Sequence, residues 1–353
     1  RRQRQMCIRD SREDMSLIKE IGANGIRLAH YPHSDEFYTL CDREGMLVWA
    51  EIPLVGKALD TPEFTENMKT ELTELIRQNF NHPSIFCWSL CNELSKGDVK
   101  GLISELNSVS HREDPGRLTV LAANVEKRPE NAVPDIMAFN TYPGWYWAEP
   151  SEMKSTLERW NRQCGNKGIA VSEYGAGANV WHHWQTGKKT PKADGVFHPE
   201  EWQATVHEQT YDAIKRSGFA WGSFVWNMFD FASASRNEGD MPGMNDKGLV
   251  SYDRKIRKDA FYFYQSEWSE EPVVHIASRR DVARRDSLTD VKVYTNCETV
   301  RLKVNGKDCG SPERNGSICI WRKVGLKHGE NQVEAFGHRG GQEFSDRCKW
   351  VLF

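Results

Sequence analysis

The chain has 353 residues, of which 39% are hydrophobic and 27% charged, and its formal net charge is −3 at pH 7. That length allows one large domain and a small one. The charge balance argues against a nucleic-acid-binding surface or a polybasic membrane patch, and no apolar run approaches the ~20 residues that span a bilayer. Nine cysteines without paired or zinc-type spacing indicate neither a disulfide framework nor a metal site.

The first eleven residues, RRQRQMCIRDS, show neither helical nor strand periodicity. They resemble the in-frame translation of a transposase-based sequencing adapter, so we expect residues 1–11 to be non-native; a genuine basic N-terminal arm is the alternative. Such segments are left out of fold reasoning. On this interpretation the natural chain continues upstream, and its signal region lies outside the sequence.

From Arg12 onward, helical segments alternate with short apolar runs, a pattern typical of βα units and a parallel sheet. Helices are predicted over residues 13–21, 37–44, 65–80, 102–110, 153–164 and 202–216. Strands are predicted over residues 25–30, 46–51, 85–92, 118–122, 136–140, 169–173 and 219–225.

Eight strands in this alternation would close a (β/α)8 TIM barrel, and a doubly wound sheet is the alternative. No GxGxxG or GxxxxGK motif follows the first strands, which disfavours a nucleotide-binding sheet. Polar residues gather at the C-terminal ends of the strands, where barrel active sites are built. They are Arg27, His30, Glu51, Asn92, Glu93, Asn140 and Glu173.

After Trp268 the pattern changes to short alternating strands, at residues 272–276, 291–296, 300–304, 317–321 and 331–336. Asn305-Gly306 is a strong hairpin signal. These features predict a small β-sandwich of roughly immunoglobulin size. The expected domains are therefore a barrel over residues 12–268 and an immunoglobulin-like sandwich over residues 269–353.

Two glutamates at strand ends suit glycoside hydrolysis, in which one protonates the leaving oxygen and the other attacks the anomeric carbon. The run from Asn81 to Glu93, NHPSIFCWSLCNE, resembles the NHPS(I/V)xxWSLxNE acid/base motif of glycoside hydrolase family 2, which contains β-galactosidases, β-glucuronidases and β-mannosidases. Further stretches match that family in consistent order, at residues 24–32, 37–45, 171–175, 224–230 and 245–250. The chain is identified as a member over roughly residues 13–268.

The resemblance implies a retaining, exo-acting enzyme with Glu173 as nucleophile and Glu93 as general acid/base. The pKa of Glu93 is expected to rise when the glycosyl-enzyme neutralises Glu173. Asn92 would hydrogen-bond the sugar 2-hydroxyl. Arg27 would keep Glu173 ionised, or form a structural ion pair in the barrel, and both roles can hold together.

Three further residues match positions that contact the sugar or the nucleophile in the family. His30 resembles the sugar-hydroxyl ligand of the HYP motif, and Tyr142 resembles the tyrosine that orients the nucleophile. Trp226 would form the apolar floor under the sugar, or belong to the core.

The chain also departs from the family pattern. Residues 52–56 replace the Glu-x-His magnesium pair of the best-known β-galactosidases, so we expect no metal and no cofactor. The barrel's first strand and the usual N-terminal domains are absent, which predicts an incomplete barrel with two unpaired edges, poor solubility and little activity. The C-terminal sandwich resembles a bacterial accessory domain.

The sugar is the least determined feature. Asn245 and Lys247 fit the Asn-x-Lys pattern with which β-glucuronidases hold the sugar carboxylate. The surrounding residues 237–248 look more like bacterial β-galactosidases, which we favour at this point; β-glucuronidase is the alternative. A non-catalytic carbohydrate-binding pseudoenzyme is the hypothesis from another class. We expect a carbohydrate as the partner, a bacterial periplasmic or cytoplasmic location, and possible homo-oligomers through missing or accessory domains.

Overall fold

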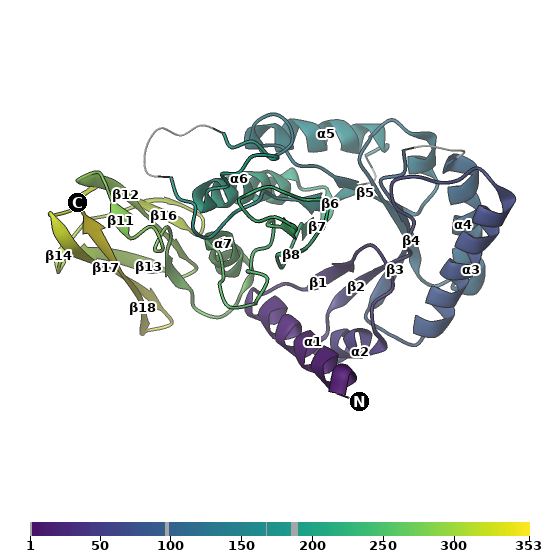
Figure 1. Ribbon diagram of the computed structural model, residues 1–353, viewed down its shortest axis with the longest axis horizontal. Coiled ribbons are helices and arrows are strands. Elements are labelled where there is room, and N and C mark those ends of the chain that lie inside the picture. Colours follow the sequence, from purple (N-terminus) through teal and green to yellow (C-terminus); the bar gives the residue numbers. More distant parts are fainter. Residues whose placement is uncertain (1, 96–98, 167, 185–189) are drawn as a thin grey trace.

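The computed structural model describes residues 2–95, 99–166, 168–184 and 190–353. Seven parallel strands, hydrogen-bonded in sequence order, curl into a nearly closed barrel (Figure 1). They are β1 (Gly25–Leu28), β2 (Leu47–Glu51), β3 (Ile85–Asn92), β4 (Leu118–Ala123), β5 (Ile136–Asn140), β6 (Ile169–Tyr174) and β7 (Ala220–Val225). Sequential order without a switch point confirms the barrel and excludes the doubly wound sheet.

Helices follow the strands on the outside of the barrel (Figure 1). They are α1 (Arg2–Glu20), α2 (Asp35–Glu44), α3 (Pro62–Asn79), α4 (Val99–Glu113), α5 (Met153–Gln163), α6 (Glu200–Ser217) and α7 (Asp259–Trp268), with 3-10 turns η1 (Pro129–Ala132) and η2 (Pro150–Glu152). Local signals set their ends: Thr61 caps α3 by accepting a hydrogen bond from Phe64 N, and Gly45 ends α2 at φ 68°.

Helix α1 begins at Arg2, so it includes most of residues 1–11, a segment whose sequence shows no helical periodicity. The helix joins the barrel to the segment before α7. Asp14 Oδ1 lies 2.8 Å from Arg254 Nε, and Glu20 Oε1 lies 2.7 Å from Arg257 Nε. These ion pairs place α1 across the side of the barrel where the first and last strands approach each other.

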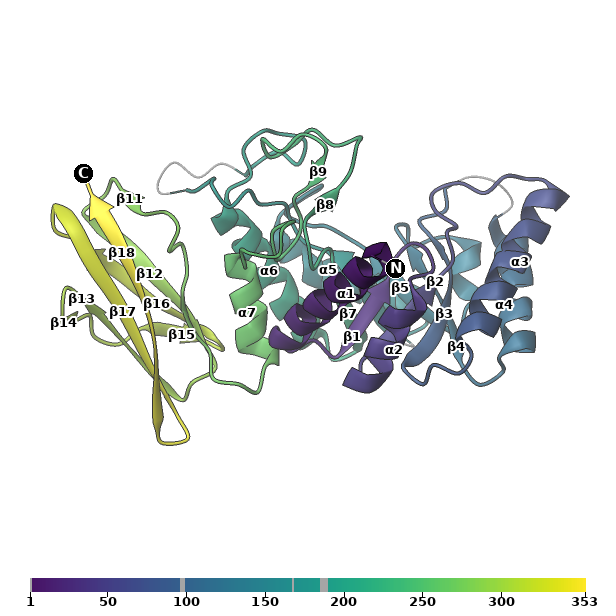
Figure 2. The ribbon, with the colours of Figure 1, turned by 60° about the horizontal axis from the view of Figure 1, so that its bottom comes forward.

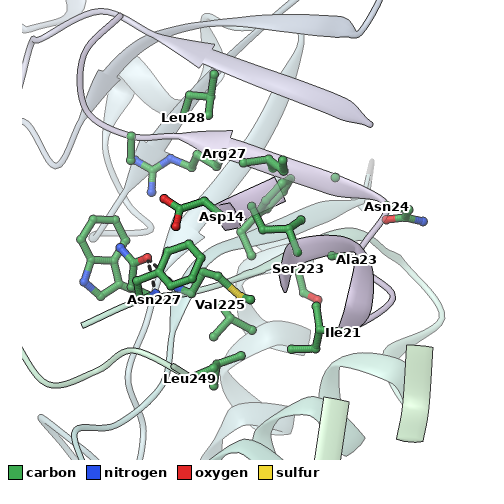
Figure 3. A pocket seen from close by; sticks show the side chains of 18 of the residues that line it. Asp14, Ile21, Ala23, Asn24, Arg27, Leu28, Ser223, Val225, Asn227 and Leu249 are labelled. Atoms are coloured by element: carbon green, nitrogen blue, oxygen red, sulfur yellow. Dashed lines mark hydrogen bonds between the residues drawn. The ribbon is translucent and has the colours of Figure 1, made fainter. Parts of the chain in front are cut away.

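Strands β1 and β7 approach each other without forming a ladder in the described part of the chain. A cavity of about 790 Å³ lies along this opening and is lined by α1, β1, β7 and the segment after β7. Figure 3 shows Asp14 of α1, Arg27 of β1 and Val225 of β7 around it. The two strand edges predicted to be unpaired therefore face a cavity covered from outside by α1.

Away from the C-terminal ends of the strands, the barrel interior is filled by large aromatic and small aliphatic side chains. Trp49 stacks near Trp221 with ring centroids 6.3 Å apart, and Phe224 meets Trp49 edge-on at 5.4 Å. Ala122, Ala138 and Ala170 complete this cluster. Because the interior is packed here, polar side chains are accommodated only toward the C-terminal ends of the strands.

Two sheets form the C-terminal sandwich, and all their strand pairs are antiparallel except the parallel pair of β11 with β18. One has the order β10-β12-β16-β15, and the other has the order β11-β18-β17-β13-β14 with β17 at its centre. The strands are β10 (Val274–Ile276), β11 (Ala283–Arg284), β12 (Leu288–Thr295), β13 (Thr299–Val304), β14 (Lys307–Asp308), β15 (Glu313–Asn315), β16 (Ile318–Gly325), β17 (Gly329–Arg339) and β18 (Gln342–Leu352). Asn305 and Gly306 have φ 52° and 76° at the predicted hairpin turn.

Besides the sandwich strands β11, β14, β15 and β18, a helix and a hairpin escaped the sequence analysis. Helix α7 packs between barrel and sandwich (Figure 1), and a short hairpin, β8 (Phe231–Ala232) with β9 (Met244–Asn245), stands in the segment after β7. Figure 2 shows β8 and β9 rising above one end of the barrel. Among the described residues, no helix is both long and apolar enough to cross a membrane.

Candidate active site

Two buried or part-buried carboxylates lie at the ends of barrel strands. Glu173 belongs to β6 and is 5% exposed. Its Oε1 accepts a hydrogen bond from Arg27 Nη1 at 2.6 Å, and its Oε2 accepts one from the hydroxyl of Tyr142, also at 2.6 Å. Asn140 is its register partner on β5 and donates to Glu93 at 2.8 Å, so one strand pair links both carboxylates.

Arg27 is shared between the strand ends. Besides Glu173, its Nη2 donates to both oxygens of Glu51 at 3.0 Å and to Asn92 Oδ1 at 2.8 Å. Burial alone would lower the pKa of Arg27, but the negative charges of Glu51 and Glu173 hold it above its ordinary value. Burial likewise raises the pKa of Glu51, and the Arg27 charge and hydrogen bonds from His30 and Ser89 lower it overall.

Glu93 follows β3 directly, and its backbone has φ 50°, a region that favours glycine. Its backbone N donates to Ala122 O at 2.8 Å, which holds this turn against β4. Burial raises the pKa of Glu93; the amide of Asn140 opposes that rise, and the negative charge of Glu173 adds to it. Glu93 is therefore the carboxyl of the pair that is suited to hold a proton.

His30 and Trp226 border the two carboxylates. His30 Nδ1 lies 2.8 Å from Glu51 Oε1, and its Nε2 lies 3.8 Å from Glu173 Oε1. The imidazole stacks on Trp226 with ring centroids 5.1 Å apart. Trp226 also lines the cavity beside β7.

Asn245 and Lys247 lie on the hairpin segment and are both buried. Asn245 Oδ1 accepts the backbone N–H of Lys247 at 3.1 Å, which fixes the turn. The Lys247 ammonium is 5.2 Å from the ring of Tyr146, and that ring meets Tyr142 edge-on at 5.1 Å. Tyr142 donates a hydrogen bond to Glu173, the nucleophile candidate. The ring of Tyr146 therefore lies between Lys247 and the tyrosine that contacts this carboxylate.

The structure therefore brings the residues singled out by sequence to the same end of the barrel. It also adds Glu51 and Asn140, which the sequence places at strand ends without a role. Tyr146 was not foreseen at all. Glu51 could have been found from the sequence, because it is a carboxylate at the end of an otherwise apolar buried strand. Such a charge needs a partner.

No group of three or more His, Cys, Asp or Glu side chains in the described ranges is arranged to hold a metal ion. The chemistry on view is that of paired carboxylates with a buried guanidinium, a tyrosine hydroxyl and amides. Such a set can transfer protons and stabilise a covalent ester at a carboxylate.

Comparison with known proteins gives consistent results. Residues 1–270 match the glycosyl hydrolases family 2 TIM barrel domain, and residues 286–345 match a domain of unknown function (DUF4982). A β-glucuronidase of Bacteroides fragilis is 43% identical over 332 residues, which are 91% of this chain and 48% of that protein. The chain thus spans about half the length of this relative.

Solved structures agree with this relationship. A Bacteroides fragilis protein provisionally described as a β-galactosidase superposes with a TM-score of 0.92 at 34% identity, covering 98% of this chain and 52% of that one. A Bacteroides uniformis β-glucuronidase superposes with a TM-score of 0.87 at 30% identity, covering 98% and 44%. Fold, strand-end motifs and relatives coincide: the chain belongs to glycosyl hydrolase family 2.

Proposed function

We propose that this chain carries the active site of a retaining, exo-acting β-glycoside hydrolase, with Glu173 as nucleophile and Glu93 as general acid/base. The observation that carries the proposal is the different setting of the two carboxylates. Glu173 accepts hydrogen bonds from a guanidinium and a hydroxyl, which suits a charged nucleophile. Glu93 has a raised pKa, which suits a proton donor.

In the first step Glu173 attacks the anomeric carbon while Glu93 gives its proton to the departing oxygen. In the second step Glu93 removes a proton from water, which attacks the same carbon and releases Glu173. Because the charge of Glu173 raises the pKa of Glu93, forming the ester lowers that pKa. This is the opposite of the rise expected from the sequence, and it suits a base in the second step.

The remaining residues are assigned supporting roles. Arg27 and Tyr142 hold the nucleophile, and His30 and Trp226 form a polar edge and an apolar floor for the sugar. Asn92 Oδ1 accepts hydrogen bonds from Arg27 and Asn140, which fixes its amide in one orientation for a sugar hydroxyl. The Lys247 ammonium, by contrast, donates no hydrogen bond to any residue in the described ranges.

For the sugar we propose a β-glucuronide. Lys247 Nζ is buried and has no hydrogen-bond partner among the described residues, which suits the carboxylate of a uronic acid. Several relatives are named β-glucuronidase, including those of Bacteroides fragilis and Bacteroides uniformis. Together these findings reverse the sequence-based preference for β-galactosidase, which becomes the second candidate because of the Bacteroides fragilis structural relative.

The test compares the rates of hydrolysis of an aryl β-glucuronide and an aryl β-galactoside. The protein used is the shortest form encoded by the source gene that hydrolyses at least one of the two. We expect the glucuronide to be preferred, and Lys247→Met to reduce glucuronide turnover far more than galactoside turnover. Preference for the galactoside, untouched by Lys247→Met, would overturn the glucuronidase proposal.

The mechanism has a separate test. A 2-fluoro-glycoside that matches the preferred sugar should leave a covalent adduct on Glu173, located by mass spectrometry of peptides. If the protein binds sugars but forms no adduct and turns over no glycoside, it is the non-catalytic carbohydrate-binding protein instead.

A further inference from the structure

Lys247 is in an unusual electrostatic position. Its side chain is 1% exposed, and its ammonium makes no hydrogen bond in the part of the chain that the structure describes. Glu238 Oε1 lies 3.6 Å from the ammonium, an ion pair that is too long for a hydrogen bond. A buried ammonium whose N–H groups donate to no acceptor costs free energy until an acceptor takes them up.

Glu238 is held by a different cation. The same oxygen, Glu238 Oε1, lies 2.7 Å from Arg236 Nη1, a hydrogen-bonded ion pair. Arg236 Nη1 also lies 3.3 Å from the hydroxyl of Tyr146, whose ring packs 5.2 Å from the Lys247 ammonium. Two cations thus flank one carboxylate oxygen, and Arg236 holds the shorter, stronger contact.

The backbone around this carboxylate is fixed. Arg236 O accepts from Gly243 N at 2.8 Å within the hairpin segment. Gly239, next to Glu238, has φ 63°, and a Cβ there would lie 2.3 Å from Asp246 Oδ2. Asn179 Nδ2 donates to Gly239 O at 2.9 Å. The backbone of Glu238 is anchored on both sides. The carboxylate can therefore change between Arg236 and Lys247 only by rotation of its side chain.

We propose that Arg236 is a specificity-determining positioning residue: by binding Glu238, it keeps that carboxylate from forming a hydrogen-bonded pair with Lys247 and so leaves the hydrogen bonds of the ammonium for the carboxylate of a uronic acid. The proposal rests on the proposed function at this site and deepens it. Without Arg236, Glu238 would turn to Lys247 and act as an internal competitor of the substrate. Neutral sugars have no carboxylate to compete, so their turnover would not depend on Arg236.

A double-mutant cycle on Arg236 and Glu238 tests this, in the same gene product as above. In Arg236→Gln we expect KM for the aryl glucuronide to rise about 10- to 100-fold, the range of one charge-assisted hydrogen bond, with kcat little changed. Galactoside kinetics should stay within about twofold. Adding Glu238→Gln to that variant should restore most of the lost KM, because the competing charge is gone.

The controls separate competition from disruption. Glu238→Gln alone should bind glucuronide at least as well as the parent, and Arg322→Gln, which removes an exposed ion pair of the sandwich, should change nothing. A matching loss for both sugars in Arg236→Gln, no loss at all, or no rescue by Glu238→Gln would overturn the role of Arg236. These outcomes leave the glucuronidase proposal intact, and that proposal fails instead if the parent prefers galactosides.

Discussion

Arg27 Nη1 lies 2.6 Å from Glu173 Oε1, and Arg27 Nη2 lies 3.0 Å from both oxygens of Glu51. One guanidinium therefore neutralises two carboxylates, and the exposed fractions of the three side chains are 3%, 7% and 0%. Because all three side chains are buried, removing the shared cation leaves two like charges close together without a counterion, which destabilises the fold.

Arg27→Met is accordingly expected to lower the free energy of unfolding by about 3–5 kcal/mol, the range for breaking a buried ion pair. Urea denaturation followed by circular dichroism measures it. Arg77→Met is the matched control, because Arg77 pairs with Glu113 at an exposed position where pairs contribute about 0–1 kcal/mol. If the two variants lose equal unfolding free energy, the buried ion pairs of Arg27 stabilise the fold no more than an exposed ion pair does.

Most of the barrel was predictable because its strands are buried on both faces. Strands β3 and β5 match their predicted ranges at both ends, since each is a largely apolar run that ends in asparagine. Helix α7 was missed for the opposite reason. Its residues Phe261, Phe263 and Tyr264 are buried between barrel and sandwich, so no polar face produces a helical period.

The pattern of strands and helices predicted the site residues that stand on strand ends, whereas Tyr142, Asn245 and Lys247 came only from the family resemblance. Arg27 and Glu173 are placed by the register of the sheet, and Glu93 directly follows β3, where its N–H donates to Ala122 O of β4. The relation between Arg236 and Lys247 depends on the hairpin after β7, where two-residue strands carry almost no periodic signal. Long-range packing, rather than local pattern, decides which charges meet there.

Replacing Glu93 tests its assignment as the proton donor. Glu93→Ala should slow turnover by about 10²–10⁴-fold, the usual contribution of general acid/base catalysis, with the greatest loss for poor leaving groups. Added azide, which needs no deprotonation, should restore turnover of an activated aryl glycoside and yield a β-glycosyl azide, identified by NMR. Glu71→Ala, an ordinary position on α3, is the control. Equal slowing for good and poor leaving groups would remove Glu93 from the acid role.

Asn140 tunes the pH range in which Glu93 is protonated. Its Nδ2 donates to Glu93 Oε1 at 2.8 Å, and this hydrogen bond lowers the pKa of Glu93 because it favours the charged form. In Asn140→Ala that effect is lost, so the pKa of Glu93 rises and the acid stays protonated to higher pH. The alkaline limb of kcat/KM against pH should shift upward. A downward shift would contradict the sign of this interaction.

His207 makes the fold sensitive to acid. It is fully buried beside Tyr264, whose hydroxyl lies 2.9 Å from His207 Nδ1, and burial with the nearby charge of Lys258 lowers its pKa to about 3. An unfolded histidine titrates near ~6.5. The stability tied to neutral His207 is thus complete above about 6.5 and is lost as pH falls toward 3, since the unfolded chain takes up the proton first.

Between pH 7.5 and 5, this linkage should remove about 2 kcal/mol of unfolding free energy from the parent chain. His207→Gln keeps a polar group beside Tyr264 but cannot titrate, so its unfolding free energy should fall by correspondingly less over the same interval. Urea denaturation at both pH values gives the comparison, with His338→Gln as an exposed control that should follow the parent. The same pH dependence in His207→Gln and in the parent would mean that His207 takes up its proton in the folded state.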